Sequence, residues 1–278
     1  MANLVTTPTR TFTGTLVAIC EPGQLDETYA ALRALHTRAA VRPIVVTFGD
    51  IPQPPMRDID AATVIEGLLP RYLDNVVAAH RVSSLPAMAW WRGGDSEVLT
   101  SLAPLVDRLV LDSPDPEGDW RAAARLVEVT SITDLRWTRL TRWRNLMAQF
   151  FDMPGVRGAA AEFVRLEIAA ADQHGARLFA AWLSRRLPTA QPLEVRISPA
   201  DRFVSQATLI GREHRLDLRL TAGATCVRAA VEGRNGAVVE RTVSLGNQSL
   251  TALLEEEMRI RARDMAFENA VRSVTEEA

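Results

Sequence analysis

The sequence predicts an α/β protein, α+β overall, in which a mostly parallel α/β layer precedes an antiparallel β meander and a long C-terminal helix. Up to about residue 155, short apolar runs alternate with helical patterns, which is typical of parallel sheets covered by helices. After Pro188 the hydrophobic pattern has period two with turn residues between the runs, which is typical of antiparallel strands. We therefore expect an α/β domain over residues 1–155 and an α+β domain over residues 156–278.

The first half contains five apolar runs that we expect to be strands. They occupy residues 14–20, 43–48, 63–65, 86–91 and 108–111. Patterns with helical spacing lie between or after them, at residues 24–40, 69–81, 96–106 and 119–130. Asp119 is expected to cap the last of these helices, because its carboxylate can accept a free amide of the first turn.

The segment of residues 134–154 combines large aromatic side chains with arginine. Its members of these two types include Trp137, Trp143, Arg136, Arg139, Arg142 and Arg144. We expect a helix over residues 142–152, capped by Thr141 and ended by the proline that follows it. Trp143 starts an apolar stripe that runs to Phe150, so it is expected to be partly buried.

The second half is expected to begin with a strand at residues 163–168 and a helix at residues 175–187. Five runs of alternating pattern follow, and Asn235-Gly236 between two of them is typical of a hairpin turn. A single helix is expected over residues 248–274, because its apolar residues form a face wide enough to lie against a sheet.

Composition excludes several classes of site. The formal net charge is −2 and the pI is about 6.1, which argues against a general polyanion binder. All 32 basic residues are arginine, so lysine chemistry is excluded. The two cysteines, Cys20 and Cys226, are expected to be buried, inert thiols. Because no apolar leader and no long apolar run is seen, a cytoplasmic protein is expected.

The sequence contains no recognisable catalytic constellation. The first predicted strand is followed by CEPGQLDE, which lacks the G-x-G-x-x-G fingerprint, and no Walker A sequence is present. The four histidines stand far apart, and there is no nucleophile elbow. We interpret the acidic loop at residues 112–119 as a solvated turn, because its spacing does not match a calcium loop. These observations favour binding or regulation over catalysis.

Two aromatic motifs resemble a known family. The first, at residues 85–93, has the pattern L-P-x-x-x-W-W-R-G, and the second, at residues 134–144, has the pattern D-L-x-W-T-R-L-T-x-W-R. A helix ending in F-F-D and a helix containing L-F-A-x-W-L-S-R follow. Together these motifs resemble the OpcA proteins, or glucose-6-phosphate dehydrogenase assembly proteins. Their order and spacing agree over roughly residues 86–187.

The resemblance implies a regulatory protein. OpcA-like proteins are not dehydrogenases; they bind glucose-6-phosphate dehydrogenase, help its oligomeric assembly and raise its activity in the oxidative pentose phosphate pathway. On this basis we expect an allosteric activator with no catalytic residue, no cofactor, no metal and no nucleic-acid or membrane partner. The residues expected to contact the partner or to shape the site are Trp91, Arg92, Trp137, Arg139, Arg142 and Arg144. Arginine suits this role because it pairs with carboxylates and stacks on aromatic rings.

Strand geometry adds one expectation about the first motif. Adjacent side chains point to opposite faces, so one ring of Trp90 and Trp91 is expected beneath the helices and the other, with Arg92, near the carboxyl edge of the sheet. In the second motif, the arginines are expected to form the exposed part, and Trp137 is expected either among them or in the core. Photosynthetic members of the family are linked to thioredoxin control through cysteines. The two cysteines here are far apart in predicted strands, so redox control is not expected.

Two other interpretations stay open. The same arginines could clamp a sugar phosphate or another anion in a sensor or an enzyme. The Trp/Arg segment could also bind nucleic acid, although the acidic pI and the apolar stripe through Trp143 argue against this interpretation.

Overall fold

The computed structural model describes residues 14–51, 54–59, 62–81, 84–189, 191–234, 236–260 and 262–276. The chain forms two compact units that interleave along the sequence. Unit one comprises Met1–Ala122, Leu126–Ile132 and Leu250–Arg261, and unit two comprises Ala123–Arg125, Thr133–Ser249 and Ala262–Ala278. The domain boundary expected at residue 155 stays a prediction.

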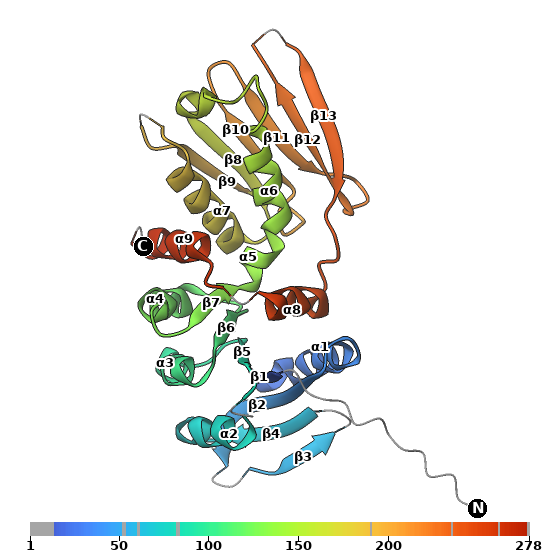
Figure 1. The fold of residues 1–278 in the computed structure, drawn as a ribbon, viewed down its shortest axis with the longest axis vertical. Coiled ribbons are helices and arrows are strands. Elements are labelled where there is room, and N and C mark those ends of the chain that lie inside the picture. The colour runs from blue at the N-terminus through green and yellow to red at the C-terminus, as the bar shows by residue number, and fades with distance from the viewer. Residues whose placement is uncertain are drawn as a thin grey trace, which may run out of the picture. The chain divides into compact units, whose positions relative to one another are not determined.

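Unit one is built on a mostly parallel sheet of seven strands (Figure 1). In spatial order these are β3 (Met56–Ile59), β4 (Ala62–Leu68), β2 (Val41–Ile51), β1 (Gly14–Cys20), β5 (Ala87–Trp91), β6 (Arg108–Leu111) and β7 (Ser131–Asp134). Strands β4, β2, β1, β5 and β6 run parallel, and β3 is antiparallel to β4. Every residue of β1 and β5 is buried, as expected of strands covered on both faces. The predicted parallel layer is confirmed.

Helices cover both faces of this sheet. They are α1 (Leu25–Arg38), α2 (Leu73–His80), α3 (Ser96–Leu102) and α8 (Leu250–Arg259), with 3-10 turns at Pro22–Gln24, Pro70–Tyr72 and Ala103–Leu105. Figure 1 shows α1 on one face and α2 and α3 on the other. Helix α8 packs beside α1, where Thr251 Oγ1 donates a 3.4 Å hydrogen bond to the carbonyl of Ala31. Helix α4 (Glu117–Leu126) has residues in both units.

Unit two contains a six-stranded sheet with helices on one face. In spatial order its strands are β13 (Val238–Ser244), β12 (Cys226–Glu232), β11 (Arg215–Leu220), β10 (Gln206–Ile210), β8 (Arg165–Ala170) and β9 (Glu194–Pro199). The predicted antiparallel meander is confirmed for β10 to β13. It is wrong for β9, which pairs parallel with β8 after a helical crossover. The turn residue Asn235 lies outside the described residues.

The helices of unit two are α5 (Leu135–Arg139), α6 (Thr141–Phe150), α7 (Gln173–Arg186) and α9 (Met265–Glu276), with a 3-10 turn at Ala159–Glu162. Helix α6 contacts β11 and β12, α7 contacts β8 and β9, and α9 packs on α7. The inward sides of the strands are apolar, so this packing removes a continuous apolar surface from water. Among the described residues, no helix is long and apolar enough to cross a membrane.

The single C-terminal helix expected over residues 248–274 is wrong. The chain forms α8 and α9 instead, and these helices belong to different compact units. Asp264 marks the break, because its Oδ1 accepts hydrogen bonds of 3.0 Å from the amides of Ala266 and Phe267 at the start of α9. The wide apolar face seen in the sequence is therefore made of two faces that are buried in different places.

Two expected helix caps are also wrong. Thr141 is the first residue of α6, and the preceding helix α5 begins after Asp134, whose Oδ1 accepts a 2.7 Å hydrogen bond from the amide of Arg136. Asp119 lies inside α4, and Pro116 occupies the cap position of that helix. The Asp119 carboxylate instead accepts hydrogen bonds from Trp91 and Ser113, outside its own helix.

Candidate functional site

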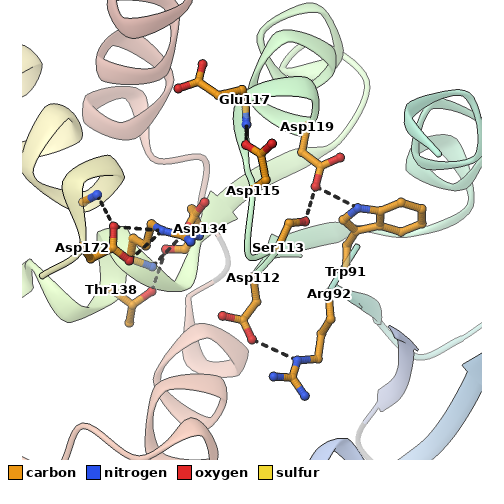
Figure 2. Close-up of polar contacts among 12 residues, drawn as sticks. Trp91, Arg92, Asp112, Ser113, Asp115, Glu117, Asp119, Asp134, Thr138 and Asp172 are labelled. Carbon is orange, nitrogen blue, oxygen red and sulfur yellow. Dashed lines mark hydrogen bonds and ion pairs between the residues drawn. The ribbon is translucent and has the colours of Figure 1, made fainter. Parts of the chain in front are cut away.

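The two tryptophans of the first motif end strand β5 and are fully buried, each with 0% of its surface exposed. The indole nitrogen of Trp91 donates a 3.0 Å hydrogen bond to Asp119 Oδ2, and that of Trp90 donates a 3.2 Å hydrogen bond to Asp112 Oδ2. Figure 2 shows Trp91 directed at Asp119 on the neighbouring helix. Both tryptophans lie at the carboxyl end of β5, as expected, but neither ring offers surface to a partner.

Arg92 is also buried, and its guanidinium is occupied within unit one. Its Nε donates to Asp112 Oδ2 at 3.2 Å, Nη1 to Thr28 Oγ1 at 2.8 Å and Nη2 to Glu27 Oε2 at 2.6 Å. The guanidinium carbon also lies 4.9 Å from the centre of the Trp90 ring. Arg92 therefore connects α1 to the loop after β6. Within this ion-pair group Glu27 reaches solvent, with 62% of its side chain exposed.

The loop after β6 supplies the acids that hold this cluster. Asp119 is buried and accepts a second hydrogen bond, from Ser113 Oγ, at the oxygen that binds Trp91. The interpretation of the loop as a solvated turn is confirmed for Asp115, which is exposed. It is wrong for Asp112 and Asp119, whose carboxylates are bound to the motif. The described residues include no group of three His, Cys, Asp or Glu side chains placed to hold a metal ion.

Cys20, at the end of β1, is buried near the same cluster. Burial raises the pKa of its thiol, and this effect outweighs the lowering by a hydrogen bond with Thr28 and by the charge of Arg92. A thiol held in its neutral form is a poor nucleophile. The expected burial is confirmed for Cys20, whereas Cys226 is only half-buried, and the inertness of the two thiols stays a prediction.

The second motif begins with a polar contact between α5 and α7. Arg136 Nε donates to both carboxylate oxygens of Asp172, at 3.0 and 3.3 Å. Asp172 also caps α7, because its Oδ1 accepts a 2.7 Å hydrogen bond from the amide of Gly175. Asp134 is completely buried beside Arg136, and Thr138 Oγ1 donates to its carbonyl oxygen, as Figure 2 shows. This network fixes the start of both helices.

Trp137 is buried, with 1% of its surface exposed, so of its two expected positions the core is the observed one. Its indole nitrogen donates a 2.7 Å hydrogen bond to Asp264 Oδ2, and its ring packs against Phe267 with 5.8 Å between ring centres. The Arg144 guanidinium lies 3.6 Å from the centre of the Trp137 ring and donates to its carbonyl oxygen. Trp137 is therefore the centre of contacts among α5, α6 and α9.

The remaining two arginines of the second motif differ in exposure. Arg139 is half-buried and lies over the Phe203 ring, 5.7 Å from its centre. Arg142 is exposed on α6. The predicted burial of Trp143 is confirmed, with 2% of its surface exposed. Of the six predicted site residues, then, Arg142 is the one whose side chain is freely presented to solvent.

Four aspartates complete the two clusters, and we did not predict any of them as site residues. They are Asp112 and Asp119 in unit one and Asp172 and Asp264 in unit two. Each accepts a hydrogen bond from an arginine or tryptophan of a motif. The N-cap pattern at Asp172 is the one local signal that could have drawn attention to such a residue.

One family model matches the part of the chain that contains the second motif. The OpcA family model that describes the C-terminal domain of a glucose-6-phosphate dehydrogenase subunit matches residues 130–271. The match covers just over half of the chain and includes the whole second motif. The chain belongs to the OpcA family. The predicted family is thus confirmed, although the first of the two motifs that carried the resemblance, at residues 85–93, lies outside the matched region.

Curated OpcA relatives agree with this assignment. A protein from Nostoc punctiforme named "Putative OxPP cycle protein OpcA" is 23% identical over 245 residues, which cover 72% of this chain and 52% of the relative. A protein of the same name from Synechocystis is 27% identical over 124 residues, which cover 41% of this chain and 26% of that relative. The chain thus spans about half the length of the first of these OpcA proteins.

Solved structures confirm the fold class. A crystal structure described as an NADPH-dependent oxidoreductase from Desulfitobacterium hafniense superimposes with a TM-score of 0.54 and covers 95% of this chain and 96% of its own. Sequence identity is 11%, so the likeness concerns the fold alone. This OpcA chain therefore shares the α/β arrangement of that structure, and a shared fold does not by itself imply a shared activity.

Proposed function

We propose that this protein is a non-catalytic assembly factor and allosteric activator of glucose-6-phosphate dehydrogenase in the oxidative pentose phosphate pathway. The observation that carries the proposal is the family match over residues 130–271, whose description names a subunit of that dehydrogenase. The names of the cyanobacterial relatives, which refer to the same pathway, add support. The absence of a dinucleotide fingerprint after the first strand is consistent with a regulatory rather than a catalytic role.

We assign two different roles to the predicted site residues. Trp91, Arg92 and Trp137 are proposed to shape the protein, because they are buried and hydrogen-bonded to aspartates. Arg142 is proposed to contact the dehydrogenase, because its exposed guanidinium is available for a bidentate pair with a carboxylate.

The remaining two arginines, Arg139 and Arg144, are proposed to assist that contact as side chains of fixed orientation near Arg142. Each is half-buried with its guanidinium over an aromatic ring. A side chain held in this way keeps one orientation and loses less entropy when a partner binds.

Activation requires that the protein distinguish two states of its partner. If it binds the active oligomer of the dehydrogenase more tightly than the inactive form, it shifts the population by the ratio of the two affinities. A tenfold ratio, worth about 1.4 kcal/mol, is enough to raise the active fraction severalfold when that fraction is small. No catalytic group on the activator is needed for this effect.

The proposal is tested with purified dehydrogenase from the same source. Size-exclusion chromatography is expected to show a complex, and the dehydrogenase is expected to have a lower KM or a higher kcat when the 278-residue protein is added. Bovine serum albumin at the same concentration controls for nonspecific stabilisation of the enzyme. Absence of both a complex and a kinetic change would refute the proposal.

The alternative of a sugar-phosphate clamp made from the motif arginines has less support. Arg92 donates to Asp112, Thr28 and Glu27, and Arg136 donates to Asp172. A phosphate would have to displace these internal partners before it could bind to the same guanidinium groups.

A further inference from the structure

Unit two carries a two-part groove that borders the second motif at Arg144. One part has a volume of about 460 Å³ and is lined by α6, α7 and the start of α9, and the adjoining part has a volume of about 230 Å³ and lies between α7 and α9. Trp182, Arg186 and Ala266 line both parts, so the two form one continuous depression, which we call the Trp182 groove. A volume of this size is within the range of roughly 300–1,000 Å³ that is common for small-molecule sites.

The larger part of the Trp182 groove is mostly apolar. Phe151, Leu183 and Leu187 line it together with small alanine side chains, and Arg144 and Arg186 also border it. Trp182 is half-buried, and one side of its ring packs against buried Phe179, with 5.5 Å between ring centres. An indole that is supported on one side and borders a groove is suited to stack on a flat ring of a ligand. This part therefore fits an aromatic or heteroaromatic group.

The smaller part is basic. Arg185 and Arg186 lie on the last turn of α7, and Asn269 lies opposite on α9. Arg185 is anchored by a 3.2 Å hydrogen bond from Nη1 to Ser273 Oγ, whereas Arg186 is exposed and has no hydrogen bond or ion pair within the described part of the chain. No carboxylate is among the described residues that line either part. The smaller part therefore fits a phosphate or a similar anion.

Arg185 and Arg186 could stand at the end of α7 for a reason other than ligand binding. Positive side chains in the last turn of a helix interact favourably with its carbonyl end. That effect would be satisfied by any exposed orientation of Arg185 and Arg186. It does not account for the apolar cavity beside them, nor for the half-buried Trp182 that lines both parts of the groove.

We propose that the Trp182 groove is a binding site for a purine nucleotide or a similar heteroaromatic phosphate. The ring lies in the apolar part against Trp182, and the phosphates lie between Arg186, Arg185 and Asn269. A sugar phosphate is polar over its whole surface and would leave the apolar part unused, so it is expected to bind more weakly. This inference goes beyond the proposed function, because it concerns a ligand of the isolated protein and needs no dehydrogenase.

The probe is ADP, titrated into the 278-residue protein by isothermal calorimetry. Saturable binding at one site is expected, with glucose 6-phosphate and pyrophosphate each binding at least about tenfold more weakly, since each ligand offers only part of the required chemistry. Arg186→Gln is expected to weaken ADP binding about tenfold, the loss typical of one charge-assisted hydrogen bond. Trp182→Phe is expected to retain part of the affinity, and Trp182→Leu to lose it.

Arg212→Gln is the matched control, because Arg212 is an exposed arginine of the same unit outside the groove. It is expected to bind ADP as the unmodified protein does, and thermal melts show whether each variant is folded. Absence of saturable ADP binding to folded protein overturns the proposal, as does wild-type affinity in Arg186→Gln. Equal affinities for pyrophosphate and ADP would show that the purine ring does not contribute to binding, which would overturn the proposed stacking on Trp182. An acidic, phenylalanine-containing peptide that binds through Arg186 while ADP does not would identify a peptide groove instead.

Discussion

The indole nitrogen of Trp137 donates a 2.7 Å hydrogen bond to the carboxylate of Asp264, which lies 127 positions later in the chain. The other oxygen of the same carboxylate caps α9 through the amides of Ala266 and Phe267. One aspartate therefore joins the tryptophan of the family motif to the start of the last helix. This relationship explains why a tryptophan flanked by arginines is buried rather than presented to a partner.

Trp137→Phe is expected to lower the free energy of unfolding by about 1–3 kcal/mol, because it removes the indole hydrogen bond to the half-buried Asp264 carboxylate. The loss of the larger ring beneath the Arg144 guanidinium acts in the same direction. Urea denaturation followed by circular dichroism measures the change. Arg142→Ala is the control, since an exposed arginine of the same motif is expected to change stability by less than about 0.5 kcal/mol. Equal stabilities for the two variants would contradict the structural role of Trp137.

Arg108 and Glu257 form an ion pair within unit one, with 7% and 2% of their side chains exposed. Arg108 Nε donates to Glu257 Oε2 at 3.0 Å, and Nη1 donates to Ser131 Oγ at 2.8 Å. Arg108→Met alone is expected to cost about 3–5 kcal/mol, because it leaves a buried charge unpaired.

The double variant Arg108→Met with Glu257→Leu is expected to recover most of that loss, since replacing both members of a buried pair by apolar side chains is often neutral. Thermal unfolding of the two single variants and the double variant measures the coupling. If the double variant is as unstable as the sum of the single ones, the pair does not act as a unit.

The proposed contact residue gives a functional prediction that rests on the proposed function. Arg142→Glu is expected to reduce activation of glucose-6-phosphate dehydrogenase at least severalfold, because it places a like charge opposite the acidic surface that we expect on the partner. Its melting temperature is expected to stay close to that of the unmodified protein. Arg212→Glu makes the same charge change on an exposed residue outside the motif. A loss of activation by both variants alike would indicate a general charge effect rather than a contact at Arg142.

The raised pKa of the Cys20 thiol predicts how stability depends on pH. The unfolded chain loses the thiol proton at the ordinary pKa, whereas the folded chain keeps it to a higher pH because burial disfavours the thiolate. The unfolded state therefore binds fewer protons between the two pKa values, so the stability contributed by this group is complete below the ordinary pKa and is lost as pH rises through the raised one.

The difference in unfolding free energy between the unmodified protein and Cys20→Ala is expected to shrink across that window, as measured by urea titrations at several pH values. Dithionitrobenzoate is also expected to label half-buried Cys226 before Cys20. Faster labelling of Cys20 would show that its burial is not maintained in solution.

Local pattern was sufficient for most elements of the fold. The runs expected at residues 14–20 and 108–111 coincide with β1 and β6. Strand β3 was not predicted, because all four of its residues are exposed and MRDI has no apolar alternation. Strand β9 was assigned to the wrong kind of pairing, since alternation predicts a strand but not the direction of its neighbour.

In the candidate site, too, local sequence predicted some features and distant contacts decided the others. The two motifs could be recognised in the sequence, because tryptophan and arginine seldom occur together at such density. Whether each side chain faces solvent was not visible, because it depends on partners such as Asp119 and Asp264 that lie 28 and 127 positions away from the tryptophans they bind.

By itself, the sequence determined the α/β class, the alternation of strands and helices, and membership of the OpcA family, because hydrophobic period and short motifs are local properties. Only the tertiary structure decided that Trp91, Arg92 and Trp137 are internal, that the C-terminal apolar stripe is divided between two compact units, and that Arg142 is left exposed. The physical reason is that burial and hydrogen-bond pairing are set by segments distant in the chain, which satisfy buried polar groups only after they have been brought together.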